Sequence, residues 1–236
     1  MSTLELVYKR IEDSKNKGLK PLVVFDLDDT LIDCRYRKRF VLREFCALEL
    51  NQKAWKDECD KVLSAKLESY EYRVADFLDN LSIDNIEFKS ALEKYWLSKY
   101  FTNTYLAADE FFPGAIRSLE KMRSLGAEIR YFTGRDEPGM KEGTVKKLNE
   151  HGLNDKLFMK PKADIADDEY KVVFFKKVLE DFDLVCFFEN ELRNLNPFVD
   201  QYPNSLFVWL DTLHSPNQPN KHVKIHTMTQ WNQENY

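Results

Sequence analysis

The clearest indication of the fold lies in residues 21–31, Pro21-Leu-Val-Val-Phe-Asp-Leu-Asp-Asp-Thr-Leu31. Residues 21–25 are apolar and predict a short strand buried on both faces, as in a parallel sheet. Three carboxylates follow at once, on Asp26, Asp28 and Asp29. Ligands of open α/β sheets bind at the carboxyl ends of the strands. The stretch therefore predicts a parallel sheet with a polar site at the end of its first strand.

Further short apolar runs repeat this strand pattern along the chain. They cover residues 128–133, 156–159, 183–188 and 205–210. Helical patterns separate the runs, and the one over residues 113–126 has a proline near its first turn and a glycine after its last, as helices commonly do. Strands that alternate with helices indicate βαβ units and a doubly wound parallel sheet.

Residues 34–111 break this alternation. The segment contains no glycine, no proline and no predicted strand, and its aromatic and aliphatic residues recur at helical spacing. We expect an all-helical insertion with a small core of its own. The predicted domains are a first core part over residues 1–33, a helical cap over 34–111 and the remainder of the core over 112–236.

The composition excludes several classes of protein. Of the 236 residues, 43% are hydrophobic, which is enough for a core, and the formal net charge is −5. This mildly acidic balance disfavours a general nucleic-acid binder. No apolar run approaches the ~20 residues of a membrane helix, and residues 1–18 lack the apolar stretch of a signal peptide. We expect a cytoplasmic protein without membrane or nucleic-acid partners, and its oligomeric state stays open.

Partners for the three carboxylates follow at the ends of later strands. Thr133 ends the second predicted strand and is followed by Gly134 and Arg135, and Glu189 ends the fourth. Lys171 opens the helix that follows the third strand. An isolated acidic triplet is more simply a turn or a helix cap. Polar residues at corresponding strand ends favour a functional site instead.

This order of residues resembles the haloacid dehalogenase-like hydrolase superfamily, which carries Asp-x-Asp-x-Thr, then Ser or Thr, then Lys, then an acidic metal-binding motif. The resemblance spans residues 20–210. It implies a Rossmann-like core with a helical cap inserted after the first strand. It also implies a phosphatase that uses Mg²⁺ and hydrolyses a small phosphorylated metabolite through an aspartyl-phosphate intermediate.

The resemblance implies a catalytic role for four residues. Asp26 is expected to be the nucleophile that attacks phosphorus. Asp28 is expected to protonate the leaving oxygen and then to activate water. Thr133 is expected to bind a phosphoryl oxygen, and Lys171 to offset charge on the nucleophile and the phosphoryl group. The second aspartate argues against dehalogenation, because it distinguishes the phosphatases and mutases of the superfamily from its dehalogenases.

The metal site implied by the resemblance consists of Asp26, the backbone carbonyl of Asp28, and Glu189. The chain departs from the family pattern here, since it reads Glu-Asn-Glu at residues 189–191 where paired aspartates are commoner. Asn190 supplies no second charge, and Asn194 is a possible helper. We expect this departure to weaken metal affinity rather than to change the reaction.

Basic residues near the site leave alternatives open. Lys176 and Lys162 compete with Lys171 for the role of the active-site lysine. Gly134 and Arg135 are candidate substrate contacts, although Arg135 is equally well explained by a surface salt bridge. In the cluster at residues 35–39, Arg35 and Arg37 are candidates for steering an anionic substrate into the cleft, and a solvated helix face is the simpler alternative.

Two rival functions remain at this stage. A phosphomutase or phosphotransferase of the same superfamily would keep both aspartates but return the phosphoryl group to a second substrate instead of water. A non-catalytic binding module would share only the fold, and the altered acidic motif at residues 189–191 is the feature that favours it. Release of phosphate, as opposed to its transfer, discriminates the phosphatase from both.

Overall fold

Residues 21–25 form the central strand β1 (Pro21–Phe25) of the computed structural model, which describes residues 1–231. All five residues are buried, because β1 lies between two parallel neighbours in a six-stranded sheet of order β5-β4-β1-β6-β7-β8. The remaining strands of that sheet are β4 (Glu128–Asp136), β5 (Lys156–Lys160), β6 (Asp183–Glu189), β7 (Leu206–Leu210) and β8 (Ile225–Met228). All its pairings are parallel, which confirms the predicted α/β, Rossmann-like core.

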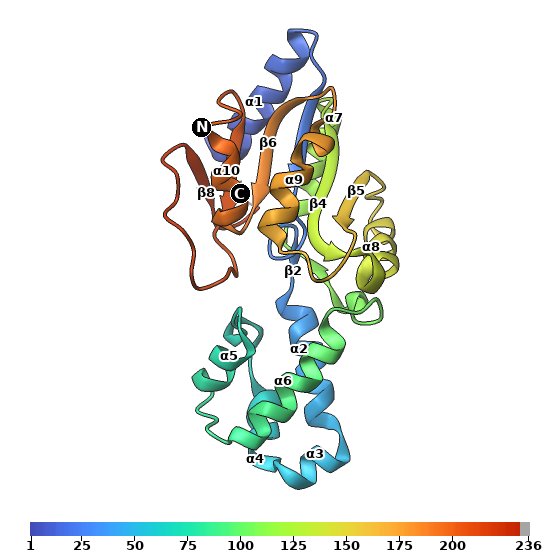
Figure 1. Cartoon of the computed structure of the whole chain (residues 1–236), viewed down its shortest axis with the longest axis vertical. Coiled ribbons are helices and arrows are strands. Elements are labelled where there is room, and N and C mark those ends of the chain that lie inside the picture. Colours follow the sequence, from blue (N-terminus) through green and yellow to red (C-terminus); the bar gives the residue numbers. More distant parts are fainter. Residues whose placement is uncertain (232–236) are drawn as a thin grey trace.

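Helices cover both faces of this sheet (Figure 1). One face packs against α1 (Thr3–Asn16) and α7 (Ala115–Ser124), and the other packs against α9 (Asp167–Leu179) and α10 (Leu192–Val199). The helix α8 (Glu137–Glu150) follows β4 directly. Among residues 1–231, no helix has the length and apolar character that a membrane span requires.

A helical unit extends from one end of the sheet (Figure 1). We use this name for residues 35–100. Its helices are α2 (Arg35–Ala47), α3 (Glu49–Ala54), α4 (Lys56–Ser64), η1 (Leu67–Ser69), α5 (Val74–Asn80) and α6 (Ile86–Tyr100). Their apolar side chains form a cluster of their own, which includes Phe45, Val62, Phe77 and Phe88. The short helix η2 (Tyr105–Ala108) then leads back to the core.

The chain enters and leaves the helical unit through two short strands. These are β2 (Ile32–Asp33) and β3 (Glu110–Phe111), which pair antiparallel as a ribbon. The expectation of no strand within residues 34–111 is therefore wrong at its end. The sequence signal was absent because each strand has only two residues.

Two further boundaries differ from the sequence prediction. The strand β4 continues beyond Thr133 to Asp136, after an irregularity in its register, and Asp136 still pairs with Lys160 of β5. The sheet also gains β8 at its edge, where two of the four residues, His226 and Thr227, are polar. A strand this short and half polar lacks the apolar run that marked the others.

Candidate active site

A cavity of about 520 Å³ lies where the carboxyl edge of the sheet meets the helical unit. Its core side contains most of the charged residues that the sequence singled out. From the helical unit and the residue after it, the lining side chains are Arg37, Lys38, Tyr72, Trp96, Tyr100 and Phe101. The lining residues from the core include Asp26, Asp28, Asp29, Gly134, Arg135, Lys160, Asp167, Lys171, Glu189, Glu191 and Asn194.

Three charged groups meet at the floor of this cavity. Asp26 directly follows β1, and its backbone N–H donates to the carbonyl of Phe188 on β6 at 2.9 Å. Lys171 extends from the first half of α9 and places its Nζ 2.7 Å from Asp26 Oδ1 and 2.5 Å from Glu189 Oε2. All three side chains are buried. The strand ends thus bring together the predicted nucleophile, lysine and acidic residue.

Burial dominates the electrostatics of this trio. It raises the pKa of Asp26 to about 6 and that of Glu189 to about 8, even though the Lys171 ammonium lowers both. Burial alone would lower the pKa of Lys171, but the two carboxylates outweigh it and raise that pKa above its usual range. One ammonium faces two carboxyl groups and does not fully offset the effect of their burial, so a further cation at the site would favour their ionised forms.

The candidate lysines differ in whether they line the cavity. The lining of the cavity includes Lys171 and Lys160, but neither Lys162 nor Lys176. Lys160 is tied to Asp167 Oδ1 at 2.7 Å and to the carbonyl of Ile165, so it does not reach Asp26.

Asp28 is held by two guanidinium groups. Arg135 on β4 donates from Nε to Oδ2 and from Nη2 to Oδ1, both at 2.8 Å, and Arg37 on α2 donates to Oδ1 at 2.5 Å. Burial alone would raise the pKa of Asp28, but these two cations outweigh it and hold that pKa well below its usual range. Arg135, expected to contact substrate or to form a surface pair, is instead a buried partner of Asp28.

Sequence reasoning missed two residues that the structure brings to this site. Asp109 is fully buried and pairs with both Arg37 and Arg135. It precedes the second crossing into the core, and no local pattern marked it. The Thr30 hydroxyl lies 3.3 Å from Asp26 Oδ2 and donates to it. Thr30 is the last residue of the Asp-x-Asp-x-Thr motif, but the motif alone does not indicate a role for it.

Thr133 and Gly134 are neighbours on β4, but of the two only Gly134 lines the cavity. Thr133 is fully buried, and its hydroxyl oxygen accepts a hydrogen bond from the backbone N–H of Arg135 at 3.2 Å. Gly134 lines the cavity, and a Cβ there would lie 2.3 Å from Asp167 Oδ2. Only glycine fits at that position while Asp167 keeps its contact with Lys160.

Arg35 is not brought to the site. Its guanidinium donates to both carboxylate oxygens of Asp33, at 2.8 and 2.6 Å, and in the described residues it lies outside the cavity lining. Asp29 does line the cavity, in a left-handed backbone conformation with φ 52°. Its carboxylate accepts from the backbone N–H of Cys34, and burial raises its pKa to about 8.

Oxygen donors of the kind that Mg²⁺ prefers surround the trio. The Asn194 side-chain oxygen is buried, lines the cavity and has no hydrogen-bond partner within residues 1–231. Asn190 instead donates to the carbonyl of Leu213 at 2.6 Å. No group of three acidic, histidine or cysteine side chains gathers as a ligand set in that part of the chain. Magnesium is commonly bound by one or two carboxylates with water and phosphate, so Asp26, Glu189 and Asn194 fit it.

The chain is similar to known proteins in sequence and in fold. The model of the HAD superfamily, subfamily IIIB (acid phosphatase), matches residues 72–204. No curated protein sequence matches the chain. Among solved structures, the chain is similar to a haloacid dehalogenase-like hydrolase from Burkholderia xenovorans LB400, with a TM-score of 0.54 and 13% identity over 90% of this chain and 94% of that one.

A second solved structure, described as a dehalogenase with an intermediate complex, has a TM-score of 0.51 and 16% identity over 89% of this chain and 93% of that one. At these identities the two structures show a shared fold and nothing more. The family model, by contrast, covers more than half of the chain. The chain therefore belongs to the HAD superfamily, subfamily IIIB.

Proposed function

We propose that the chain is a phosphatase that depends on Mg²⁺ and hydrolyses a small phosphorylated substrate through an aspartyl-phosphate on Asp26. The observation that carries this proposal is the buried contact of Lys171 with both Asp26 and Glu189, at the end of the central strand. This arrangement presents a carboxylate nucleophile, a fixed cation and a second carboxylate to one cavity. Membership of a family described as acid phosphatases supports the same reaction.

The first transfer requires a nucleophile that is held in place and partly neutralised. An oxygen of the Asp26 carboxylate forms a bond to phosphorus while the bond from phosphorus to the leaving oxygen breaks. The Lys171 ammonium, 2.7 Å from Oδ1, offsets negative charge as the phosphoryl group approaches. Water then attacks phosphorus, phosphate is released and the carboxylate is restored.

Asp28 is the proposed proton donor to the leaving oxygen and the base that later activates water. Its two arginine partners hold its pKa low, and the negative charge of a bound phosphate would raise that pKa so that Asp28 can carry the proton. Its side chain is 34% exposed and lines the cavity, whereas its two arginine partners are buried. A second aspartate at this position separates phosphatases from dehalogenases in the resemblance described above. We therefore favour phosphoryl transfer to water over dehalogenation.

The metal would be held by residues of the trio and their neighbours. Asp26, Glu189, the backbone carbonyl of Asp28 and the Asn194 amide oxygen are the proposed ligands. When bound there, Mg²⁺ supplies positive charge that weakens repulsion between the carboxylate and the phosphate dianion. The weaker acidic motif predicts a lower metal affinity than paired aspartates would give.

Residues 34–111, which contain the helical unit, are the proposed cap domain of this enzyme. Tyr72 and Phe101 are both more than 40% exposed, and both line the cavity opposite the carboxylates. A cap that closes over the cavity would exclude water during the first transfer and admit it for hydrolysis. Its lining side chains would also select the substrate.

The proposed function is tested by a screen of phosphorylated metabolites, with release of inorganic phosphate as the readout. We expect hydrolysis of at least one small phosphomonoester with Mg²⁺ and none in excess chelator. Transfer of the phosphoryl group to a second substrate without release of phosphate would favour the phosphomutase. Absence of both reactions across the screen would contradict the proposal.

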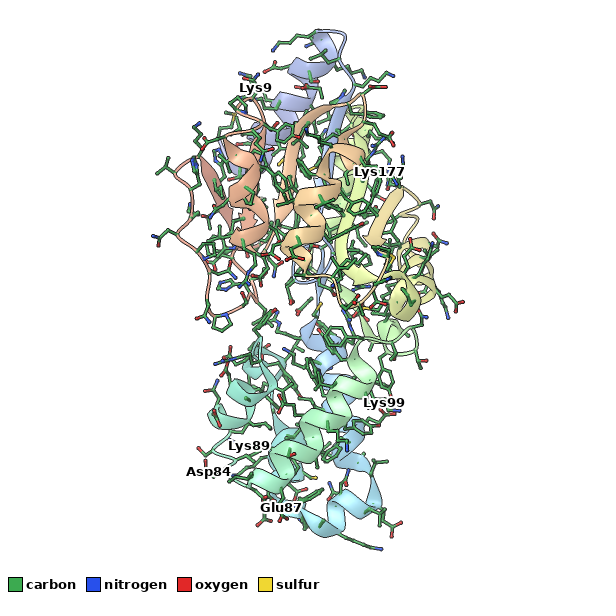
Figure 2. All side chains as sticks on the ribbon, viewed as in Figure 1. Lys9, Asp84, Glu87, Lys89, Lys99 and Lys177 are labelled. Atoms are coloured by element: carbon green, nitrogen blue, oxygen red, sulfur yellow. The ribbon has the colours of Figure 1, made fainter. Side chains whose placement is uncertain are left out.

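Glu189→Gln is expected to raise the Mg²⁺ concentration required for half-maximal activity, because the amide carries no charge for the metal. The variant should keep its fold, since glutamine can still accept from the backbone N–H groups of Asn190 and Glu191. Titration of activity with Mg²⁺ measures the effect. Glu87→Gln, at an exposed site on α6 (Figure 2), is the matched control. Equal Mg²⁺ requirements in the two variants would contradict the assignment of Glu189 as a metal ligand.

Lys171→Met is expected to lower kcat by about 10²–10³-fold, the usual effect of removing one fixed group that stabilises developing charge. Lys176→Met is the matched control, because Lys176 is exposed on the same helix. Steady-state kinetics of both variants, with thermal unfolding to verify their folding, check the result. If Lys176→Met or Lys162→Met lost activity while Lys171→Met kept it, the lysine assignment would be wrong.

A further inference from the structure

Four charged side chains form a closed ring between the core and the helical unit. We call Asp28, Arg37, Asp109 and Arg135 the charge ring. Each arginine contacts both aspartates. Arg37 donates to Asp28 at 2.5 Å and to Asp109 at 2.7 Å, and Arg135 donates to Asp28 at 2.8 Å and to Asp109 at 2.7 Å. The ring is neutral as a whole, since two guanidinium groups face two carboxylates.

Three members of the charge ring line the cavity, but only Asp28 has a substantially exposed side chain. The side chains of Arg37, Arg135 and Asp109 are at most 1% exposed, whereas that of Asp28 is 34% exposed. The two oxygens of Asp28 also differ. Within residues 1–231, Oδ1 accepts from both arginines and from the Cys34 thiol, whereas Oδ2 accepts from Arg135 Nε alone. The ring therefore fixes Oδ1 and leaves Oδ2 less engaged.

The members of the ring come from both sides of the ribbon β2–β3. Arg37 lies in the first turn of α2, soon after β2, and Asp109 directly precedes β3. Arg37 is also held by the helical unit, because its guanidinium lies 4.4 Å from the ring centre of Tyr100 and donates to the Tyr100 carbonyl at 3.4 Å. On the core side, Asp28 follows β1 and Arg135 lies in β4. The orientation of Asp28 is thereby linked to the position of the helical unit.

From this geometry we infer that Arg37 and Asp109 are positioning residues, which orient the Asp28 carboxylate toward the leaving oxygen when the helical unit is seated on the core. The inference rests on the proposed function, because it concerns the same reaction. Arg37 acts only through Asp28 and contacts no reacting atom. Asp109 acts one step further away, by holding both guanidinium groups in place.

The test is a kinetic double-mutant cycle with Arg37→Met, Asp28→Asn and the double variant. Each is assayed on 4-nitrophenyl phosphate, whose leaving group needs little protonation, and on ³²P-labelled glycerol 2-phosphate, whose leaving group needs more. A misplacement of about 1 Å can cost about 10²-fold in rate, so we expect a fall of about this size for Arg37→Met on glycerol 2-phosphate. The fall on 4-nitrophenyl phosphate should be about tenfold smaller, and the effect should vanish in the Asp28→Asn background.

Three further variants keep the test decisive. Arg37→Lys retains the charge and should recover part of the lost rate on glycerol 2-phosphate. Asp109→Asn keeps the side-chain volume and should show the same selective fall if Arg37→Met does not fold. Arg43→Met, at an exposed site on the same helix, is the matched control and should match the wild type on both esters.

Two results would overturn the inference, and they differ. In the first, the wild type is active, Arg37→Met slows hydrolysis of both esters equally, and its effect adds in full to that of Asp28→Asn. The charge ring would then be a structural element only, and the proposed function would remain intact. A wild type that hydrolyses neither these two esters nor any other phosphomonoester would overturn the proposed function and the positioning role together.

Discussion

Asp26→Asn is expected to abolish turnover, because an amide is a poor nucleophile toward phosphorus. Binding of substrate should survive in part, since Lys160 and Lys171 remain at the cavity. Loss of phosphate release in steady-state assays, with binding measured separately by calorimetry, checks this result. The side chain is buried, so thermal unfolding must establish that the variant is folded.

The matched control for this variant is Asp84→Asn. Asp84 is exposed, and Figure 2 shows it at the end of the helical unit remote from the core. A fluoride complex of beryllium, which mimics a phosphoryl group on a carboxylate, should bind the wild type and Asp84→Asn but not Asp26→Asn. Substantial turnover by Asp26→Asn would exclude the aspartate as nucleophile.

Asp28→Asn is expected to lower kcat by about 10²–10⁴-fold on an alkyl phosphate, the usual effect of losing a general acid and base. Asparagine keeps the size of the side chain and removes the proton that is transferred. On 4-nitrophenyl phosphate the first transfer should be less affected, because its leaving group needs little protonation. The rates at which one preparation of the variant hydrolyses the two esters provide the comparison.

Stability must be measured beside these rates. Asp28 belongs to the charge ring, and breaking a buried ion pair by removing one partner is strongly destabilising. A variant that unfolds would lose activity on both esters equally, whereas loss of the proton donor slows the first transfer mainly on the alkyl ester. That transfer is measured in a single turnover, because loss of the base slows the later attack of water for both esters alike. Near-normal turnover of the alkyl ester by a folded Asp28→Asn protein would rule out the acid and base role.

The core was predictable because each of its central strands carries its own apolar signal. Strand β1 is buried on every residue, and β6 is nearly so, as strands in the middle of a parallel sheet must be. The edge strand β8 was not predictable in this way, since two of its four residues are polar and only one neighbour pairs with it. The continuation of β4 to Asp136 depends on pairing with β5, which local sequence does not contain.

The trio at the cavity floor was predictable for a related reason. Asp26 directly follows β1, and Glu189 is the last residue of β6. These two strands are adjacent and parallel, so the sheet itself brings the two side chains together. The helical position of Lys171 completed the set, but the choice among several nearby lysines needed the structure. The geometry favours Lys171, which alone in the described chain contacts both carboxylates.

The charge ring was not predictable, because it joins residues that are distant in the chain. Arg37 and Asp109 meet only when the two crossings of the ribbon pair. Arg35 and Arg37 were considered together in the sequence, yet residues two apart on a helix do not share a face. Arg35 accordingly pairs with Asp33, while Arg37 turns inward to Asp28.

The proposed mechanism requires a covalent phosphoryl intermediate on Asp26, which can be trapped. Metal dependence cannot separate this route from direct attack by water, because both need carboxylates and Mg²⁺. Wild-type protein mixed with substrate and quenched in acid within milliseconds should carry a phosphoryl group on the peptide that contains Asp26, as detected by mass spectrometry. Asp26→Asn treated alike should carry none. Active enzyme that never yields an acyl-phosphate on Asp26, under conditions where turnover is measured in parallel, would contradict the nucleophile assignment.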